Sequence, residues 1–200
     1  MDPVRFIGNY SSGKMGYSLA NELASRGARV LLVSGPVALT VNHPNIQLIK
    51  VTSALEMHRE AVNLFPGTDG AIMCAAVADY RPSQQFGQKM KRKSDQLKIE
   101  LIPNPDIAAS LGEIKKEKQV LVGFALETNN ELENASAKLK KKQLDFIVLN
   151  SLNDPGAGFQ SASNKITIIG KDNKMYNFEL KSKEEVASDI VDHMETIISL

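Results

Sequence analysis

The sequence predicts an α/β fold in which a mostly parallel sheet is covered by helices on both of its faces. Short apolar runs, each long enough for one strand, alternate along the chain with segments in which apolar residues recur every three or four positions. The apolar runs are nearly continuous, which is typical of strands buried on both faces of a sheet. These two observations indicate a doubly wound, Rossmann-like sheet, whose ligands bind beyond the carboxyl ends of the strands.

The expected elements follow from these patterns in chain order. Strands are expected at 28–33, 46–51, 70–76, 97–102, 119–125 and 144–150, and a hairpin at 165–170 and 175–180. Helices are expected at 12–26, 53–64, 105–112, 129–142 and 182–200. Ser53 and Ser182 are each followed three residues later by glutamate, which is the pattern of a capping box. Asn104 is expected to cap the third helix, with Pro105 at its first position.

Composition and charge exclude several classes of protein. The 200 residues fit one domain, 42% of them are hydrophobic, and the formal net charge is +1. This balance predicts neither a nucleic-acid nor a membrane partner, and no apolar run is long enough to cross a bilayer. With one cysteine, three scattered histidines and no secretion signal at the start, we expect a cytoplasmic protein without a disulfide or a structural zinc site.

The regular pattern stops between residues 77 and 96. A loop of this length inside a compact domain is usually functional or mobile, so we expect a flap here. It carries the basic run Lys89-Met90-Lys91-Arg92-Lys93. Such a run is commonly a solvated surface, but beside an anion site its lysines would fold over phosphate groups.

The segment 8–16 nearly matches a P-loop. The pattern fails at Met15, where a hydroxyl should hold magnesium, so we reject a P-loop nucleotide hydrolase. What remains is a helix opened by Ser11, Ser12 and Gly13, whose free backbone N–H groups would attract a phosphate. A plain helix cap, with glycine for close packing, explains the same residues equally well.

The other polar segments also have simple structural interpretations. The fingerprint G-x-G-x-x-G is absent, and Ser34-Gly35-Pro36 offers no acidic residue for a ribose, which counts against an NAD-dependent oxidoreductase. Ala75 and Ala76 would let a ligand approach the backbone, and Asp79 would accept hydrogen bonds or hold Mg²⁺, although a turn aspartate is the simpler interpretation.

Lys138 and Lys142 lie four positions apart on one face of a predicted helix, as surface charges commonly do. Segment 104–107 is typical of a helix cap. Phe124 and Cys74 are typical of a core.

In order, however, these segments resemble one family, the phosphopantothenate–cysteine ligases. The matching stretches are D-P-V-R-F-I at 2–7, Asn9, S-S-G-K-M-G at 11–16, V-S-G-P at 33–36, A-A-V-A-D at 75–79, K-M-K at 89–91, N-P-D-I at 104–107, and G-F-A at 123–125 with E-T at 127–128. Such ligases often form the C-terminal half of a bifunctional coenzyme A biosynthesis protein, behind a flavin-dependent decarboxylase.

The resemblance implies a function and roles for single residues. It implies a homodimeric enzyme that joins L-cysteine to 4′-phosphopantothenate through an acyl-cytidylate made from CTP with Mg²⁺. The expected nucleotide-binding residues are Ala75, Ala76, Asp79, Lys89, Asn104, Pro105, Asp106, Ile107, Phe124, Lys138 and Lys142. Asn9 matches an asparagine tied to the acyl intermediate, with Arg5 nearby, and Lys89 is the expected catalytic cation on the flap. Ser11, Ser12 and Gly13 remain the expected phosphate-binding turn.

Two features depart from the family pattern. Gly8 stands where the family usually has Ser or Thr, and the family has a further strand before Asp2, so a first strand is expected upstream of residue 1. Two other classes stay open. An NAD(P)-binding oxidoreductase would bind NADPH, and a non-catalytic nucleotide-binding subunit would bind CTP without releasing pyrophosphate. No motif reads the base, so CTP and ATP are not distinguished.

Overall fold

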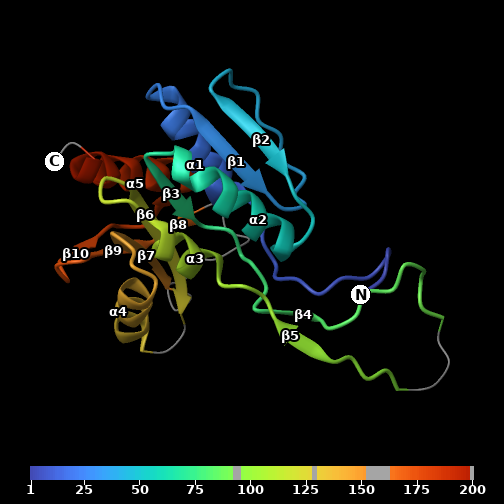
Figure 1. The fold of residues 1–200 in the computed structure, drawn as a ribbon. Helices are drawn as coiled ribbons and strands as arrows, with labels where there is room; N and C mark the ends of the chain where they lie inside the picture. The colour runs from blue at the N-terminus through green and yellow to red at the C-terminus, as the bar shows by residue number, and fades with distance from the viewer. Residues whose placement is uncertain (92–95, 128–129, 152–162, 199–200) are drawn as a thin grey trace.

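The computed structural model describes residues 1–91, 96–127, 130–151 and 163–198 of the chain. Its centre is a five-stranded sheet in the order β10-β9-β7-β6-β3. The strands are β3 (Gly70–Met73), β6 (Val120–Glu127), β7 (Phe146–Ser151), β9 (Ile166–Gly170) and β10 (Met175–Asn177). β3, β6 and β7 are parallel, whereas β9 and β10 form the expected antiparallel hairpin at the edge. The predicted α/β class is confirmed (Figure 1).

A second, two-stranded parallel sheet joins β1 (Val30–Ser34) to β2 (Ile46–Lys50). In the described part of the chain, β1 pairs only with β2, and β3 pairs only with β6. β1 and β3 thus each have an unpaired edge, where backbone groups lack the partners that a neighbouring strand supplies.

Helices cover both faces of the large sheet, as predicted. α1 (Lys14–Ser25) and α5 (Lys183–Ile198) pack on one face, and their side chains share a core with alternate residues of β6 and β7. α2 (Ala54–Leu64), α3 (Ile107–Ile114) and α4 (Glu131–Lys141) contribute to the core on the other face, together with the short 3-10 helix η1 (Phe65–Gly67). Val148 points into the first core and Ile147 into the second. This alternation explains why the strand sequences are apolar throughout.

The predicted capping box at Ser182 is complete, whereas the one at Ser53 is formed in part. The Ser53 hydroxyl accepts a hydrogen bond from the Glu56 backbone N–H at the start of α2, and the Glu56 carboxylate accepts from the backbone N–H and hydroxyl of Thr52. At the start of α5, the Ser182 hydroxyl accepts from the Glu185 backbone N–H, and the Glu185 carboxylate accepts from the Ser182 backbone N–H. Two of the helices therefore begin where the sequence indicates.

Arg26 ties α1 to α5 across the molecule. Its guanidinium donates to Glu22 one turn back, and to Asp192, Glu195 and Ser188 on α5. The carboxylates of Asp192 and Glu195 hold the guanidinium in this place, and their charges raise its pKa. The two helices form one layer, although Arg26 and Asp192 are 166 residues apart in sequence.

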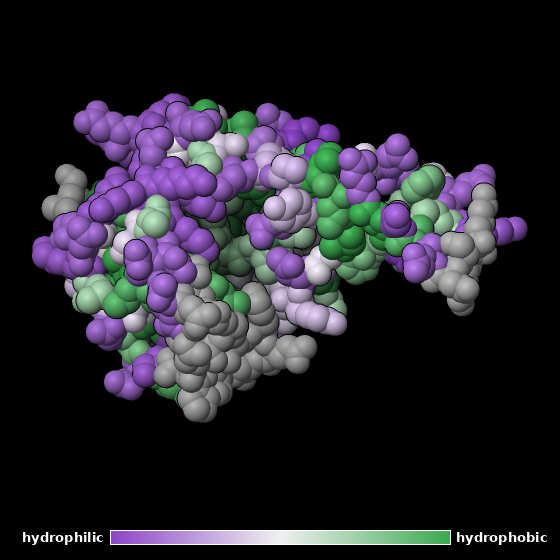
Figure 2. Space-filling model, turned by 90° about the horizontal axis from the view of Figure 1, so that it is seen from below, coloured by the Kyte–Doolittle hydropathy of each residue, from purple (hydrophilic) through white to green (hydrophobic). Residues whose placement is uncertain are grey.

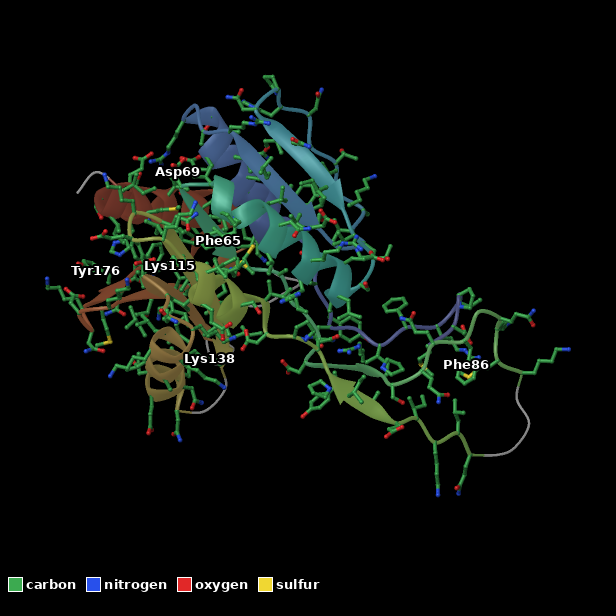
Figure 3. The ribbon with its side chains drawn as sticks, in the orientation of Figure 1. Phe65, Asp69, Phe86, Lys115, Lys138 and Tyr176 are labelled. Atoms are coloured by element: carbon green, nitrogen blue, oxygen red, sulfur yellow. The ribbon has the colours of Figure 1, made fainter. Side chains whose placement is uncertain are left out.

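At the amino ends of the strands, Asp145 holds a buried ion network. Its carboxylate accepts hydrogen bonds from the Leu121 backbone N–H (2.6 Å), from Lys115 Nζ (3.0 Å) and from Lys171 Nζ (2.5 Å). The Asp145 and Lys115 side chains are 11% and 12% exposed, and that of Lys171 is 55% exposed. Figure 3 labels Lys115 in this region.

An arm projects from the body between β3 and α3 (Figure 1). Its base is a two-stranded antiparallel ribbon of β4 (Tyr80–Pro82) and β5 (Leu101–Pro103). The prediction that 77–96 is irregular throughout is therefore wrong at β4, and the strand predicted at 97–102 is wrong before Leu101. A third small sheet pairs β8 (Ser163–Asn164) with β11 (Lys181–Ser182). Within the described residues, no helix is both long and apolar enough to span a membrane.

Candidate functional site

The turn at the start of α1 has the shape expected of an anion site. Gly13 is its N-cap with φ of +75°, and within the described part of the chain no side chain caps the helix. A Cβ on Gly13 would lie 2.9 Å from Val37 Cγ1, so both the backbone angle and the packing require glycine. The Ser11 hydroxyl accepts weakly from Gly13 N at 3.3 Å, and that of Ser12 from Lys14 N at 3.4 Å.

Two asparagine side chains hold the segment that follows β3. Asn9 Nδ2 donates to the Val77 carbonyl at 3.2 Å, and Asn104 Nδ2 donates to the Ala78 carbonyl at 2.8 Å. The Asn104 backbone N–H donates to the Asp79 carbonyl at 2.8 Å. Three predicted site segments, distant in sequence, therefore meet beyond the carboxyl end of β3. This arrangement is the one a doubly wound fold predicts.

Arg81 is a site residue that sequence analysis missed. Its guanidinium donates to the Pro103 carbonyl and, at 3.3 Å, to Asn104 Oδ1. Arg81 thereby fixes which way the Asn104 amide points, so that its NH₂ group faces Ala78. Its position directly after Asp79 and Tyr80 was the only signal in the sequence.

Asp106 begins α3 and also holds Lys142. Its Oδ1 accepts from the Ala109 backbone N–H at 3.1 Å and lies 3.1 Å from Lys142 Nζ. Burial alone would raise the pKa of the Asp106 carboxyl, but the Ala109 and Lys142 hydrogen bonds outweigh it and hold that pKa below its usual range. The prediction that Asn104 caps this helix is wrong: Asp106 is the N-cap, and Ile107 is the first helical residue.

Lys142 is the C-cap of α4 rather than its last helical residue. Gly112 packs against it so closely that a Cβ there would lie 2.3 Å from the Lys142 carbonyl oxygen. Lys138 lies on α4 (Figure 3), and it precedes Lys142 by one helical turn in the sequence. Of these two lysines, Lys142 pairs with Asp106 and so belongs to the cluster at the start of α3.

The remaining predicted contacts lie near this cluster. Ala75 and Asp79 are exposed, Ala76 is half-buried, and the Val77 backbone N–H donates to the Ala75 carbonyl in a tight turn. Phe124 lies on β6 next to β3 and packs partly against the core beneath α1. The exposed backbone and carboxylate of residues 75–79 leave a polar surface that can receive a ligand.

Two predicted catalytic residues lie elsewhere. Lys89 is exposed on the arm, and Arg5 is bound to Asp2 and to the Met90 carbonyl. The structure does not bring Lys89 or Arg5 next to Asp79. Arg92 and Lys93 of the basic run lie outside the described residues.

The acidic side chains near the site fit a metal ion that is held mainly by the phosphates of a bound substrate. Among the described residues, no three His, Cys, Asp or Glu side chains are grouped as a metal site would require. Mg²⁺ commonly uses one or two carboxylates together with substrate phosphates and water. The single exposed carboxylate of Asp79 fits that mode and does not fit an all-protein cage.

A doubly wound sheet, a helix that begins after a glycine, and a segment held by two asparagines beyond the carboxyl end of β3 are features of an α/β protein that binds a ligand at this end of its sheet. The chain belongs to the family described as the DNA/pantothenate metabolism flavoprotein C-terminal domain, whose family model matches residues 1–198. The family resemblance found in the sequence is thus confirmed.

Relatives of known name match almost the whole chain. It is 42% identical over 200 residues to the coenzyme A biosynthesis bifunctional protein CoaBC of Vibrio parahaemolyticus, covering 99% of this chain and 50% of that protein. It is 41% identical to CoaBC of Bacillus subtilis, with 98% and 48% covered. It is also 54% identical to a protein of an unknown prokaryote named cysteine/cysteine sulfinic acid decarboxylase, with 99% and 55% covered. The chain spans about half the length of these relatives.

Solved structures agree. The C-terminal domain of CoaBC superposes with a TM-score of 0.82 at 38% identity, covering 99% of this chain and 89% of that domain. A Cab2 variant in complex with phosphopantothenate-cysteine superposes with a TM-score of 0.76 at 17% identity, covering 98% and 82%. The second likeness concerns the fold alone.

Proposed function

We propose that this chain catalyses the ligase step of coenzyme A biosynthesis, in which L-cysteine is joined to 4′-phosphopantothenate at the expense of CTP. The observation that carries the proposal is the meeting of Asn9, segment 77–79 and Asn104 beyond β3, in a chain that matches the C-terminal domain of CoaBC along 99% of its length. The decarboxylase and bifunctional names describe proteins about twice as long, so a fused decarboxylase half is part of the proposal.

The reaction needs positioning and charge stabilisation rather than a protein nucleophile. A carboxylate oxygen of 4′-phosphopantothenate attacks the α-phosphorus of CTP, forming an acyl-cytidylate and breaking the bond to pyrophosphate. The cysteine amine then attacks the acyl carbon, CMP leaves with the bonding electron pair, and the amine loses a proton. Each step develops negative charge on phosphate oxygens, which lysines and backbone N–H groups stabilise.

The described residues divide this work between them. The start of α1, with Gly13, offers N–H groups to a phosphate, and Lys142 supplies a cation that Asp106 keeps in place. Asn9 holds the Val77 carbonyl with one N–H and has the rest of its amide for the acyl intermediate. Mg²⁺ would be held by the nucleotide phosphates and Asp79, and it would neutralise their charge.

A homodimer is the second part of the proposal. Figure 2 shows hydrophobic residues gathered along the arm. Large apolar side chains exposed on the arm and on the N-terminal segment beside it include Phe6, Tyr80, Phe86, Leu97 and Leu101. Exposed apolar patches of this kind mark protein contacts, and a second copy presents the same surface.

Leu97→Glu should therefore convert dimers to monomers in size-exclusion chromatography with light scattering. Leu132→Glu changes an exposed leucine on α4 instead and serves as the matched control. Equal masses for the two variants and the unmodified protein would refute the arm as the interface.

A pyrophosphate-release assay with 4′-phosphopantothenate, cysteine and either CTP or ATP tests the function. We expect release with CTP that depends on 4′-phosphopantothenate and Mg²⁺. Release without the acid contradicts the proposal. Binding of CTP without release supports the non-catalytic subunit, and binding of NADPH supports the oxidoreductase.

A further inference from the structure

The N-terminal segment runs along the arm and is bonded to it. The Phe86 backbone N–H donates to the Met1 carbonyl at 3.0 Å. Met1, Phe86 and Met90 together line one shallow pocket on the arm. These contacts join the first residues of the chain to the stretch that carries Lys89.

The Asp2 carboxylate is the centre of this junction. Oδ1 accepts from the backbone N–H groups of Val4 and Arg5, both at 2.9 Å. Oδ2 accepts from Arg5 Nε at 3.0 Å and from the Met90 backbone N–H at 3.1 Å. The Asp2 side chain is 0% exposed. With Arg5 Nη2, which also donates to Oδ2, the carboxylate has five donors, and such an acceptor is a built site rather than a chance surface contact.

Asp2 holds the backbone N–H of Met90, and Arg5 holds its carbonyl. Arg5 Nη2 donates to the Met90 carbonyl at 2.8 Å as well as to Asp2. The N–H and the C=O of Met90 are therefore both held, by two side chains that are bonded to each other. We call this arrangement the Asp2–Arg5 clip. The Arg5 guanidinium holds the pKa of the Asp2 carboxyl well below its usual range, so the clip stays charged at neutral pH.

Holding Met90 on both sides limits the backbone freedom of its neighbour Lys89. The Lys89 side chain is exposed, so the restraint reaches this residue through the backbone of Met90. A fixed backbone lowers the conformational entropy that a long, flexible lysine loses when its ammonium group binds a phosphate.

We propose that Asp2 is a positioning residue for Lys89, acting through the clip on Met90. The role of Lys89 itself rests on the proposed function. Asp2→Asn keeps the size of the side chain but removes its charge. It also replaces one acceptor oxygen by an NH₂ group, which cannot accept from the Met90 N–H or from Arg5. Asp172→Asn is the matched control, because Asp172 also bonds a lysine and a backbone N–H, in the β9–β10 turn.

We expect Asp2→Asn to lower kcat about 10-fold or more with little change in the KM for 4′-phosphopantothenate. In a Lys89→Ala background the same change should have no further effect on kcat, because the two residues act as one unit. Asp2→Glu, which restores the charge, should recover part of the loss. Amide hydrogen exchange at Met90 should accelerate about 10-fold in Asp2→Asn and stay unchanged in Asp172→Asn.

Two results would overturn the positioning role. One is unchanged exchange at Met90 in Asp2→Asn, whatever the activity. The other is an equal loss of kcat with and without Lys89. Faster exchange at Met90 in a protein that releases no pyrophosphate even when unmodified overturns the proposed function instead and supports the restraint. Circular dichroism melting of each variant shows that the change is local.

Discussion

Replacing Asp145 by asparagine removes the negative charge and one of the two acceptor oxygens at the centre of its ion network. The remaining amide oxygen cannot serve Lys115, Lys171 and the Leu121 N–H together, and Lys115 Nζ keeps its 2.8 Å hydrogen bond to the Gln143 carbonyl. Breaking a fully buried pair costs about 3–5 kcal/mol. Lys171 is 55% exposed and regains water, so the lower end of this range applies. We expect a loss of about 3 kcal/mol in the free energy of unfolding, or about 6–12 °C in Tm for a chain of this size.

The pH dependence gives a sharper test. Burial alone would raise the pKa of the Asp145 carboxyl, but the bonds from Lys171, Leu121 and Lys115 hold it below its usual range. A depressed folded-state pKa contributes stability above the unfolded pKa, near 3.9, and loses it as the pH falls through the folded value. The Tm difference between Asp145→Asn and the unmodified protein should therefore be constant from about pH 7 to pH 5 and shrink below about pH 4.

Thermal melts by circular dichroism at each pH measure this difference. Asp172→Asn, whose partner Lys174 is largely exposed, should shift Tm by no more than about 2 °C. A Tm for Asp145→Asn within about 2 °C of the unmodified protein at pH 7, or a difference that does not shrink as the pH falls from about 5 to about 2, would refute the reasoning.

The other predictions concern the site and the sheets. Lys89→Ala should lower kcat by about 10²–10³ while Lys91→Ala changes it little; steady-state kinetics decide, and equal losses contradict the assignment of Lys89. Gly13→Ala combines a disfavoured φ with the Val37 contact and should weaken CTP binding while lowering Tm by a few degrees, measured by calorimetry; normal affinity would exclude the α1 turn as the phosphate site. Lys142→Ala should raise the Kd for CTP about 10-fold, and an unchanged Kd would return Lys142 to a structural role. A chain extended upstream by about 15–20 residues should melt higher, because an added strand would pair the open edges of β1 and β3; identical Tm values would contradict this.

The fold was predictable where periodicity and capping act locally. Ser53 and Ser182 begin helices as expected because their hydrogen bonds reach only three residues along the chain. Asparagine is an equally good N-cap residue, but the Asn104 side chain donates to the Ala78 carbonyl instead, and Asp106 caps α3. The tertiary structure decides whether such a side chain caps the nearby helix or bonds a distant carbonyl. A pattern in one sequence therefore does not reveal the outcome.

The sheets show the same limit. β4 contains Pro82, which argues against a strand, yet the strand exists because it forms an edge of a two-stranded ribbon.

For the site, the order of motifs indicated which residues gather near Asn104. It did not indicate that Asp106 would hold Lys142, or that Arg5 would bind the arm through Met90. Both contacts join segments more than 30 residues apart.

The pairing of α1 with α5 sets the order in which this protein can fold during synthesis. Residues of α1 that face the core, Leu19 among them, lie against Val186, Ile190 and Val191 of α5. At about 5–20 residues per second, some 8–30 seconds pass between synthesis of Arg26 and of its partner Asp192, 166 residues later. Through that interval the helix that opens the phosphate-binding turn has an uncovered apolar face, a natural binding site for chaperones. Nascent chains arrested before α5 should therefore be captured by them, and should lack a formed turn at Gly13.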